Sequence, residues 1–365
     1  MMKKIEYKNP IAIRKEHLSC PLALALESYW NCEADCYHCV GRRLNKVWGE
    51  EQRVTNPENV KKTLLNALKN KKPKSLIAQA LHLKKAFFLG RKADPYQPIE
   101  NELKITQRLI KILIELKWPV VVCSRYQENM ERDTNLLWKG GKYIHLLTEI
   151  TPGAEADWEL FERKRTTPIE KRLSITRYWQ KLGIKVGVRG EPYIPGYHKL
   201  SQFRDMLKRL KSYGLNSYNT YNLHINEYTI KRLYGIGLDI EKIWTLNQDK
   251  HWSKTQKRLC RIADEVGITL GCPDFVNVPI NWVNTTNTCC GIDVKNALEY
   301  NTHNWRNLIL QKNDPIVALA LTWEGIGSYE DRKKANAIVL GKSSKDYYTF
   351  KDAGLLIKTK KDESI

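Results

Sequence analysis

The chain has 365 residues, of which 42% are hydrophobic and 28% are charged, a balance typical of a globular protein that builds its own core. Its longest apolar runs, such as PIVALALTW at 315–323, are too short to span a membrane, and the N-terminal stretch lacks the apolar segment of a secretory signal. A cytoplasmic location follows as the expectation, and with it a role other than disulfide formation for the nine cysteines.

Runs of β-forming residues alternate with segments of helical periodicity between residues 22 and 224. The expected strands are 22–30, 84–90, 119–124, 143–151, 184–194 and 217–224. The expected helices are 57–70, 99–117, 132–141, 169–183 and 201–214. Repeated βα units form a parallel sheet with right-handed crossovers, so we predict an α/β fold: a partial (β/α)6 barrel of the TIM type, with its chemistry at the carboxyl ends of the strands.

The alternation weakens after residue 235, where a cysteine-bearing segment begins. We therefore expect a lead-in at 1–24, the barrel at 25–235 and a cysteine-rich extension at 236–300. A C-terminal segment at 301–365 then ends in a charged, frayed tail.

Three cysteines lie close together directly after the first expected strand, in the stretch YWNCEADCYHCVGRR. Cys32, Cys36 and Cys39 have the spacing C-x3-C-x2-C. Thiolates are the usual ligands of a 4Fe–4S cluster, and three of them leave one of its irons open. A zinc site is the alternative, although structural zinc normally takes four protein ligands, and His38 lies between two of the cysteines in a tight turn.

This cysteine motif, with the ring of His38 just before its last cysteine, resembles the signature of the radical S-adenosylmethionine (SAM) superfamily. The resemblance implies a 4Fe–4S cluster whose open iron binds SAM. It also implies reductive cleavage of SAM to a 5′-deoxyadenosyl radical that takes a hydrogen atom from the substrate. An electron donor such as flavodoxin or ferredoxin is then the expected partner.

Further segments, among them FFLGRKADPYQPIE, RDTNLL and EPYIPG, resemble in the same order the spore photoproduct lyase-like branch of that superfamily. The lyases use a cysteine as hydrogen donor three residues before the aspartate that Asp94 resembles. Arg91 stands at this position, so the lyase reaction itself is not expected. Cys123, at the end of the strand 119–124, is a substitute donor; a buried cysteine without catalytic function is the alternative.

The resemblance also implies where SAM binds. Gly90 and Arg91 match a segment that contacts its amino group, Thr148 and Glu149 are candidates for the ribose hydroxyls, and Arg189 is the candidate for the carboxylate. Ordinary polar residues at strand ends are the alternative.

The DPYQP segment contributes Asp94, Tyr96 and Gln97 as candidate substrate contacts. A rigid turn fixed by its two prolines explains the same segment equally well.

A second set of cysteines, Cys260, Cys272, Cys289 and Cys290, predicts an auxiliary metal site, with an iron–sulfur cluster favoured over zinc. Adjacent cysteines rarely ligate together, so three of these with Cys20 or solvent are an alternative set.

The formal net charge of +21 favours a nucleic-acid partner, and aromatic residues near strand ends can stack on bases. Such residues are Tyr193, Tyr197, Tyr218 and Tyr221. We therefore expect a radical SAM enzyme that modifies or repairs a nucleic-acid base. The alternatives are a radical SAM enzyme acting on a peptide or small metabolite, and a zinc-containing nucleic-acid-binding protein without catalytic activity.

Overall fold

The computed structural model describes residues 5–13, 22, 24–39, 41, 51–73, 76–271, 288–289 and 292–293. The expected segment 301–365 and most of the extension that precedes it lie outside these residues. Among the described helices, none is long and apolar enough to cross a membrane.

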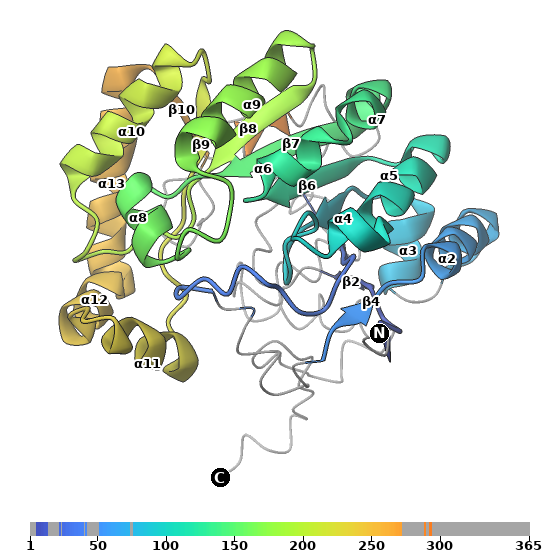
Figure 1. The fold of residues 1–365 in the computed structure, drawn as a ribbon, viewed down its shortest axis with the longest axis horizontal. Helices are drawn as coiled ribbons and strands as arrows, with labels where there is room; N and C mark the ends of the chain where they lie inside the picture. Colours follow the sequence, from blue (N-terminus) through green and yellow to red (C-terminus); the bar gives the residue numbers. More distant parts are fainter. Residues whose placement is uncertain are drawn as a thin grey trace, which may run out of the picture.

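One curved sheet organises the described part of the chain, with eight strands in the order β10-β9-β8-β7-β6-β5-β3-β2 (Figure 1). Its strands are β2 (Ile11–Ile13), β3 (Leu24–Leu26), β5 (Phe87–Leu89), β6 (Val120–Ser124), β7 (Ile144–Glu149), β8 (Lys185–Arg189), β9 (Ser217–Asn219) and β10 (Thr269–Gly271). All neighbouring strands are parallel except β2, which runs antiparallel to β3. Two short pairs are not hydrogen-bonded to it, β1 (Ile5–Glu6) with β4 (Arg53–Val54) and β11 (Thr288–Cys289) with β12 (Ile292–Asp293).

Helices connect the parallel strands, and several of them pack against the outer face of the sheet (Figure 1). They are α2 (Pro57–Lys69), α3 (Leu76–His82), α4 (Glu100–Leu103), α5 (Ile105–Glu115), α6 (Gln127–Glu131), α7 (Thr134–Lys139), η1 (Gly141–Tyr143), α8 (Glu155–Leu160), α9 (Ile169–Lys181), α10 (Leu200–Ser212), α11 (Glu227–Gly235), α12 (Ile240–Asn247) and α13 (Asp249–Val266). In α10, for example, the buried residues Phe203, Met206, Leu207 and Leu210 recur at helical spacing and face the core. The central strands are apolar on both faces because helices cover one face and the barrel interior the other.

The predicted partial barrel of alternating strands and helices is confirmed, and it continues further than expected. All six predicted strands form, although each of the first and last is only three residues long. β10 adds a seventh parallel strand beside β9, and α13 packs against α10. The sheet thus extends past residue 235, where the sequence suggested a boundary.

The single helix expected at 99–117 is two helices in the structure. Lys104 adopts a left-handed conformation with φ of 51° and separates α4 from α5. The buried carboxylate of Glu100 accepts hydrogen bonds from the backbone N–H groups of Thr106 (2.9 Å) and Gln107 (3.0 Å). It thereby satisfies two of the four N–H groups that the start of α5 would otherwise leave without partners.

Candidate functional site

A cavity of about 380 Å³ lies at the carboxyl ends of the parallel strands. Its lining residues come from the cysteine loop at 32–41, from the segments after β5 and β9, and from the ends of β6, β7 and β8. Cys32, Cys36 and Cys39 all line this cavity. The fold therefore brings the three predicted ligands to the place where barrel enzymes carry their chemistry.

Contacts from two sides hold the cysteine loop in place. The amide oxygen of Gln97 accepts a hydrogen bond from the N–H of Glu33, and its amide nitrogen donates to the carbonyl of Asn31, both at 2.8 Å. On the other side, the guanidinium of Arg232 on α11 donates to the carbonyl of Cys36 at 3.0 Å. These bonds fix the backbone on both sides of Cys32.

The three thiols line one cavity, an arrangement that a 4Fe–4S cluster would fit, because each of its thiolate ligands binds a different iron. Within the described residues, no group of three or more His, Cys, Asp or Glu side chains was found that could hold a single metal ion. Gly41 leaves room beside the third thiol, because an added Cβ would lie 3.4 Å from Sγ of Cys39 and 2.7 Å from the carbonyl oxygen of Lys92.

Burial dominates the electrostatics of the thiols of Cys32 and Cys36. Burial, and then the nearby Asp94, raise the pKa of Cys32 to about 12, and burial raises that of Cys36 well above its ordinary value. A metal ligand has to be a thiolate, so metal binding here releases protons.

The DPYQP segment links the cysteine loop to the end of β6. The carboxylate of Asp94 accepts hydrogen bonds from Ser124 Oγ and from the N–H of Arg125, both at 2.7 Å, and the Asp94 N–H donates to Sγ of Cys32 at 3.4 Å. Asp94 lines the cavity, whereas Tyr96 and Gln97 are fully buried. Tyr96 donates to Asp133 at 3.1 Å, so the structure gives Tyr96 and Gln97 a supporting role in place of the expected substrate contact.

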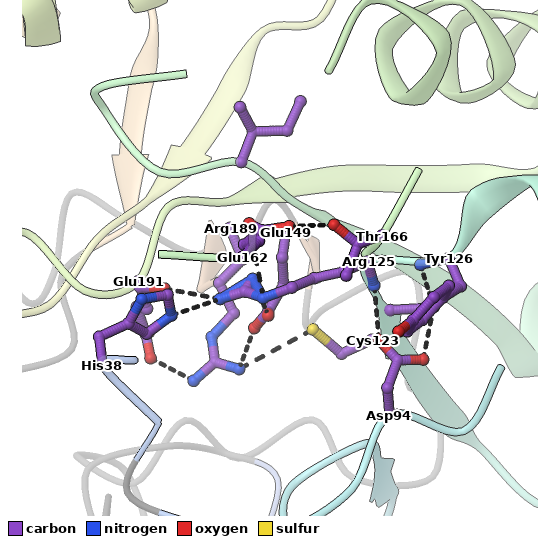
Figure 2. Close-up of polar contacts among 12 residues, drawn as sticks. His38, Asp94, Cys123, Arg125, Tyr126, Glu149, Glu162, Thr166, Arg189 and Glu191 are labelled. Atoms are coloured by element: carbon purple, nitrogen blue, oxygen red, sulfur yellow. Dashed lines mark hydrogen bonds and ion pairs between the residues drawn. The ribbon is translucent and has the colours of Figure 1, made fainter. Parts of the chain in front are cut away.

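Arg125, directly after β6, is the centre of the polar contacts around the cavity (Figure 2). Its guanidinium forms an ion pair with Glu149 at 2.5 Å, lies 3.7 Å from Glu162 and donates to the carbonyl of Glu191 at 3.0 Å. Its Nη2 lies 3.2 Å from Nε2 of His38 in the cysteine loop. Although burial opposes its charge, Glu149 and Glu162 raise the pKa of Arg125 above its ordinary value.

His38 is neutral in this environment. Burial, and then the charge of Arg125, lower the pKa of His38 to about 3. Because a guanidinium can only donate, Nε2 of His38 accepts from Arg125 and the ring proton lies on Nδ1.

Two further buried charged residues, Glu162 and Arg172, form an ion pair next to Arg125. Glu162 pairs with the fully buried Arg172 of α9, which also donates to the carbonyl of Glu149 at 2.7 Å. Although burial works in the opposite direction, Arg172 and Arg125 lower the pKa of Glu162 to about 2. Glu162 therefore stays ionised and holds both arginines in place.

Three residues at the ends of β7 and β8 were expected to contact SAM; two of them line the cavity and one does not. Glu149 and Arg189 line the cavity, and Nη1 of Arg189 donates to Oε1 of Glu149 at 2.8 Å. Thr148 instead points to the helix layer, where its hydroxyl lies 2.5 Å from that of Thr176. Successive side chains of a strand alternate between its faces, so Thr148 and Glu149 cannot both face the cavity, and Thr148 is not placed to contact a ribose there.

Arg189 lies between two carboxylates, pairing with Glu191 as well as Glu149. Although burial opposes its charge, these carboxylates raise its pKa well above the ordinary value. Its Nη1 also lies 3.8 Å from Sγ of Cys123, a buried thiol that lines the cavity. Burial raises the pKa of Cys123 well above its ordinary value, so this thiol keeps its proton.

Gly90 and Arg91 follow β5 and also line the cavity. Gly90 has φ of 109°, and an added Cβ would lie 2.3 Å from the carbonyl oxygen of Cys123. Only glycine fits here, because the conformation and the close approach both exclude a side chain.

The four tyrosines expected near strand ends lie in different environments. Tyr193 and Tyr218 are buried, and their hydroxyls donate to the carbonyls of His198 (3.0 Å) and Ile150 (2.9 Å), so they do not face the cavity. Tyr197 packs against Phe161. Tyr221 contacts His224, which lines the cavity, with the two rings tilted by 36°.

The second cysteine set stays a prediction. Cys260 is buried in α13, and Cys289 lies on β11. Cys272, Cys290 and the side chain of Cys289 lie outside the described residues, as does Cys20.

Sequence reasoning missed three charged residues of the site, Arg125, Glu162 and Arg172. Two of them, Arg125 and Arg172, stand at sequence positions that could have revealed them. Arg125 follows an apolar strand immediately, and Arg172 is an arginine on the buried face of a helix. Buried charges are rare unless they are paired, so such positions indicate a network.

Comparison with known proteins supports the fold. No family model matches the chain, and no curated protein matches its sequence. Spore photoproduct lyase complexed with the dinucleoside spore photoproduct has a similar structure, with a TM-score of 0.54 at 12% identity over 74% of this chain and 80% of that chain. A cysteine-to-serine variant of the lyase gives 0.55 at 12% identity, over 74% and 80% of the two chains. A doubly substituted variant with bound AdoMet and dinucleoside spore photoproduct gives 0.51 at 12% identity, over 72% and 81%. The chain therefore has the fold of spore photoproduct lyase, a partial barrel of parallel strands connected by helices.

Proposed function

We propose that the chain is a radical SAM enzyme. The observation that carries this proposal is the convergence of Cys32, Cys36 and Cys39 on one cavity at the carboxyl ends of a parallel partial barrel. The solved lyase variant that contains AdoMet has the same fold, which agrees with SAM as the cosubstrate.

In this proposal the three cysteines hold a 4Fe–4S cluster with one iron left for SAM. When loaded and reduced, such a cluster supplies the electron that cleaves the sulfonium of SAM. We assign Gly90 and Arg91 to the amino group of SAM, and Glu149 and Arg189 to its other polar groups; that all four line the cavity supports this assignment. A carboxylate has about four lone-pair sites, so Glu149 retains acceptor capacity beside its two arginines.

The remaining charges of the cavity position these groups. Arg125 forms an ion pair with Glu149 and contacts His38. Glu162, which pairs with Arg172, also pairs with Arg125 and so keeps its guanidinium in place. Because these pairs are buried, they fix the side chains before any ligand binds, which is the condition for orienting a reactive group.

We further propose a nucleic acid as the substrate, with modification or repair of a base as the reaction. The formal net charge of +21 supports this choice, and so does the structural likeness to a lyase complexed with a dinucleoside photoproduct. Arg91 stands where the lyases have their hydrogen donor, so we assign that role to the protonated thiol of Cys123.

The decisive experiment measures iron, sulfide and 5′-deoxyadenosine in anaerobically reconstituted, reduced protein. We expect a brown protein that cleaves SAM, with stimulation by one of single-stranded DNA, duplex DNA or RNA. Alanine at Cys32, Cys36 or Cys39 should abolish both cluster and cleavage, whereas Cys123→Ala, another thiol of the same cavity, should keep the cluster. A colourless zinc protein would contradict the proposal, and cleavage indifferent to every nucleic acid would redirect the search to peptides and metabolites.

A further inference from the structure

Helix α13 has two faces of opposite character. Its buried residues include Trp252, Leu259 and Ala263, which recur at helical spacing and pack into the core beside α10. The opposite face carries four exposed cations, Lys254, Lys257, Arg258 and Arg261. From Lys250 to Ala263 the sequence contains no acidic residue. We call these four residues the basic face of α13.

The basic face is not neutralised by the part of the chain that the structure describes. None of its four side chains has a hydrogen bond, an ion pair or a ring contact with another described residue. Three arginines of the barrel differ from them, because Arg132, Arg172 and Arg209 each pair with a carboxylate. Charges that serve only solubility are usually interspersed with the opposite sign, whereas an unbalanced row of cations suits a polyanion.

Helices α11 and α12 precede α13 in the chain, and α12 packs against both α11 and α13 (Figure 1). The start of α11 borders the cavity, because its N-cap residue Asn226 lines it. Arg232 of α11 donates to the carbonyls of Asp35 and Cys36 in the cysteine loop, both at 3.0 Å. Two aromatic side chains on this path are unusually exposed, Tyr234 at 73% and Trp244 at 50%. Exposed aromatic rings among cations are the combination on which single-stranded nucleic acids stack their bases.

We propose that the basic face of α13 binds the phosphate backbone of a nucleic acid whose target base enters the cavity. This rests on the proposed function, and it assigns the binding surface to helices outside the six predicted βα units. Seven residues of helix rise by about 10 Å, so the four cations of the face follow that length of backbone. A duplex carries about six phosphate charges over this distance, enough for every cation of the face.

The test compares two variants of the full-length, reconstituted protein that lose the same charge. The first carries Lys254→Gln, Lys257→Gln, Arg258→Gln and Arg261→Gln. The control carries Lys62→Gln, Lys69→Gln, Lys71→Gln and Lys72→Gln, four exposed lysines of α2 and the turn after it, near the other edge of the sheet. Fluorescence anisotropy with labelled single-stranded DNA, duplex DNA and RNA gives the affinity of each protein between about 50 and 200 mM salt.

We expect the first variant to bind at least tenfold more weakly than the control. For four lost phosphate contacts, the slope of log K against log salt should fall by about 2.8 with single strands and about 3.6 with duplex DNA. Equal weakening in both variants would overturn the proposal, because net charge alone would then explain binding. Binding to vesicles of anionic phospholipid without binding to any oligonucleotide would also overturn it. The assay needs no SAM cleavage, so an inactive protein that shows the expected difference would contradict only the proposed function.

A second pair of variants tests stacking. Trp244→Ala should weaken binding of single-stranded DNA severalfold, while Trp138→Ala, which removes an equally exposed ring (57%) from α7, should not. Equal effects of the two substitutions would exclude α12 from the binding surface.

Discussion

Arg125 and His38 join the barrel to the cysteine loop: Nη2 of Arg125 lies 3.2 Å from Nε2 of His38, which directly precedes the third cysteine. The same guanidinium pairs with Glu149 at the end of β7 and contacts the carbonyl of Glu191 beyond β8. One side chain thus fixes the loop relative to the two strands whose polar residues line the cavity.

Loss of Arg125 should destabilise the protein strongly. In Arg125→Ala we expect the free energy of unfolding to fall by roughly 3 kcal/mol, because Glu149 loses one and Glu162 one of its two cationic partners. Arg125→Lys keeps the charge without the planar fork, so it should lose less. Urea denaturation measures both, with Arg165→Ala as the control at a half-exposed arginine. An Arg125→Ala protein as stable as wild type would contradict this account of the network.

Gln97 should control how firmly the cysteine loop holds the proposed cluster. Gln97→Glu can still accept from the N–H of Glu33, but it can no longer donate to the carbonyl of Asn31, and Gln97→Ala loses both bonds. Each buried group left without a partner costs about 1–3 kcal/mol, so the loop should loosen in the order wild type, Glu, Ala.

Iron loss to a chelator measures this order. Asn101→Ala, which removes an exposed amide with hydrogen bonds of its own, is the control. Identical rates in all four proteins would show that Gln97 does not hold the loop.

The charge of Glu162 predicts a pH dependence of stability. Its pKa is about 2 in the folded protein and about 4.3 in an unfolded chain, so its ionised form stabilises the fold above about pH 4.3. This contribution, on the order of 3 kcal/mol, is lost as the pH falls from about 4.3 towards 2.

The measurement is the difference in unfolding free energy between wild type and Glu162→Gln at several pH values. It should be large at neutral pH and shrink below about pH 4. The control is Glu159→Gln, at an exposed carboxylate paired with Lys164, where we expect a small difference at every pH. A difference for Glu162 that does not change with pH would mean that its charge is not what stabilises the fold.

Substitutions at the neighbouring residues Thr148 and Glu149 should have different effects, the first on stability and the second on SAM binding. Thr148→Val removes the hydroxyl that contacts Thr176, so it should lower stability by about 1 kcal/mol and leave SAM affinity unchanged. Glu149→Gln should weaken SAM binding, measured by equilibrium dialysis. If Thr148→Val weakens SAM binding instead, its side chain contacts the ligand after all.

Cys123 should deliver solvent-derived hydrogen to the product. In this step the S–H bond breaks, its hydrogen atom goes to the substrate radical, and the electron donor together with a solvent proton restores the thiol. In D2O the product should therefore carry one deuterium, detected by mass spectrometry. Cys123→Ala should still cleave SAM but give product without this label, and a labelled product from that variant would exclude the role.

Local sequence patterns were sufficient for the barrel. Apolar strands such as 120–124 and amphipathic helices such as 200–212 follow from side-chain periodicity alone, and their alternation implies parallel strands whose carboxyl ends meet at one edge. The break between α4 and α5 at Lys104 could not be predicted from the sequence. It depends on the side chain of Glu100, which caps the start of α5 from a buried position that only the tertiary packing creates.

The sequence by itself determined that three thiols share one loop after the first barrel strand, since ligand spacing is a local property of the chain. Only the tertiary structure decided which other residues reach that loop. Gln97, Arg125 and Arg232 lie 66, 87 and 196 positions from the loop atoms they contact. Their roles, and the turning of Thr148 away from the cavity, depend on which side chains the fold brings together in a buried, low-dielectric site, where each charge needs a partner.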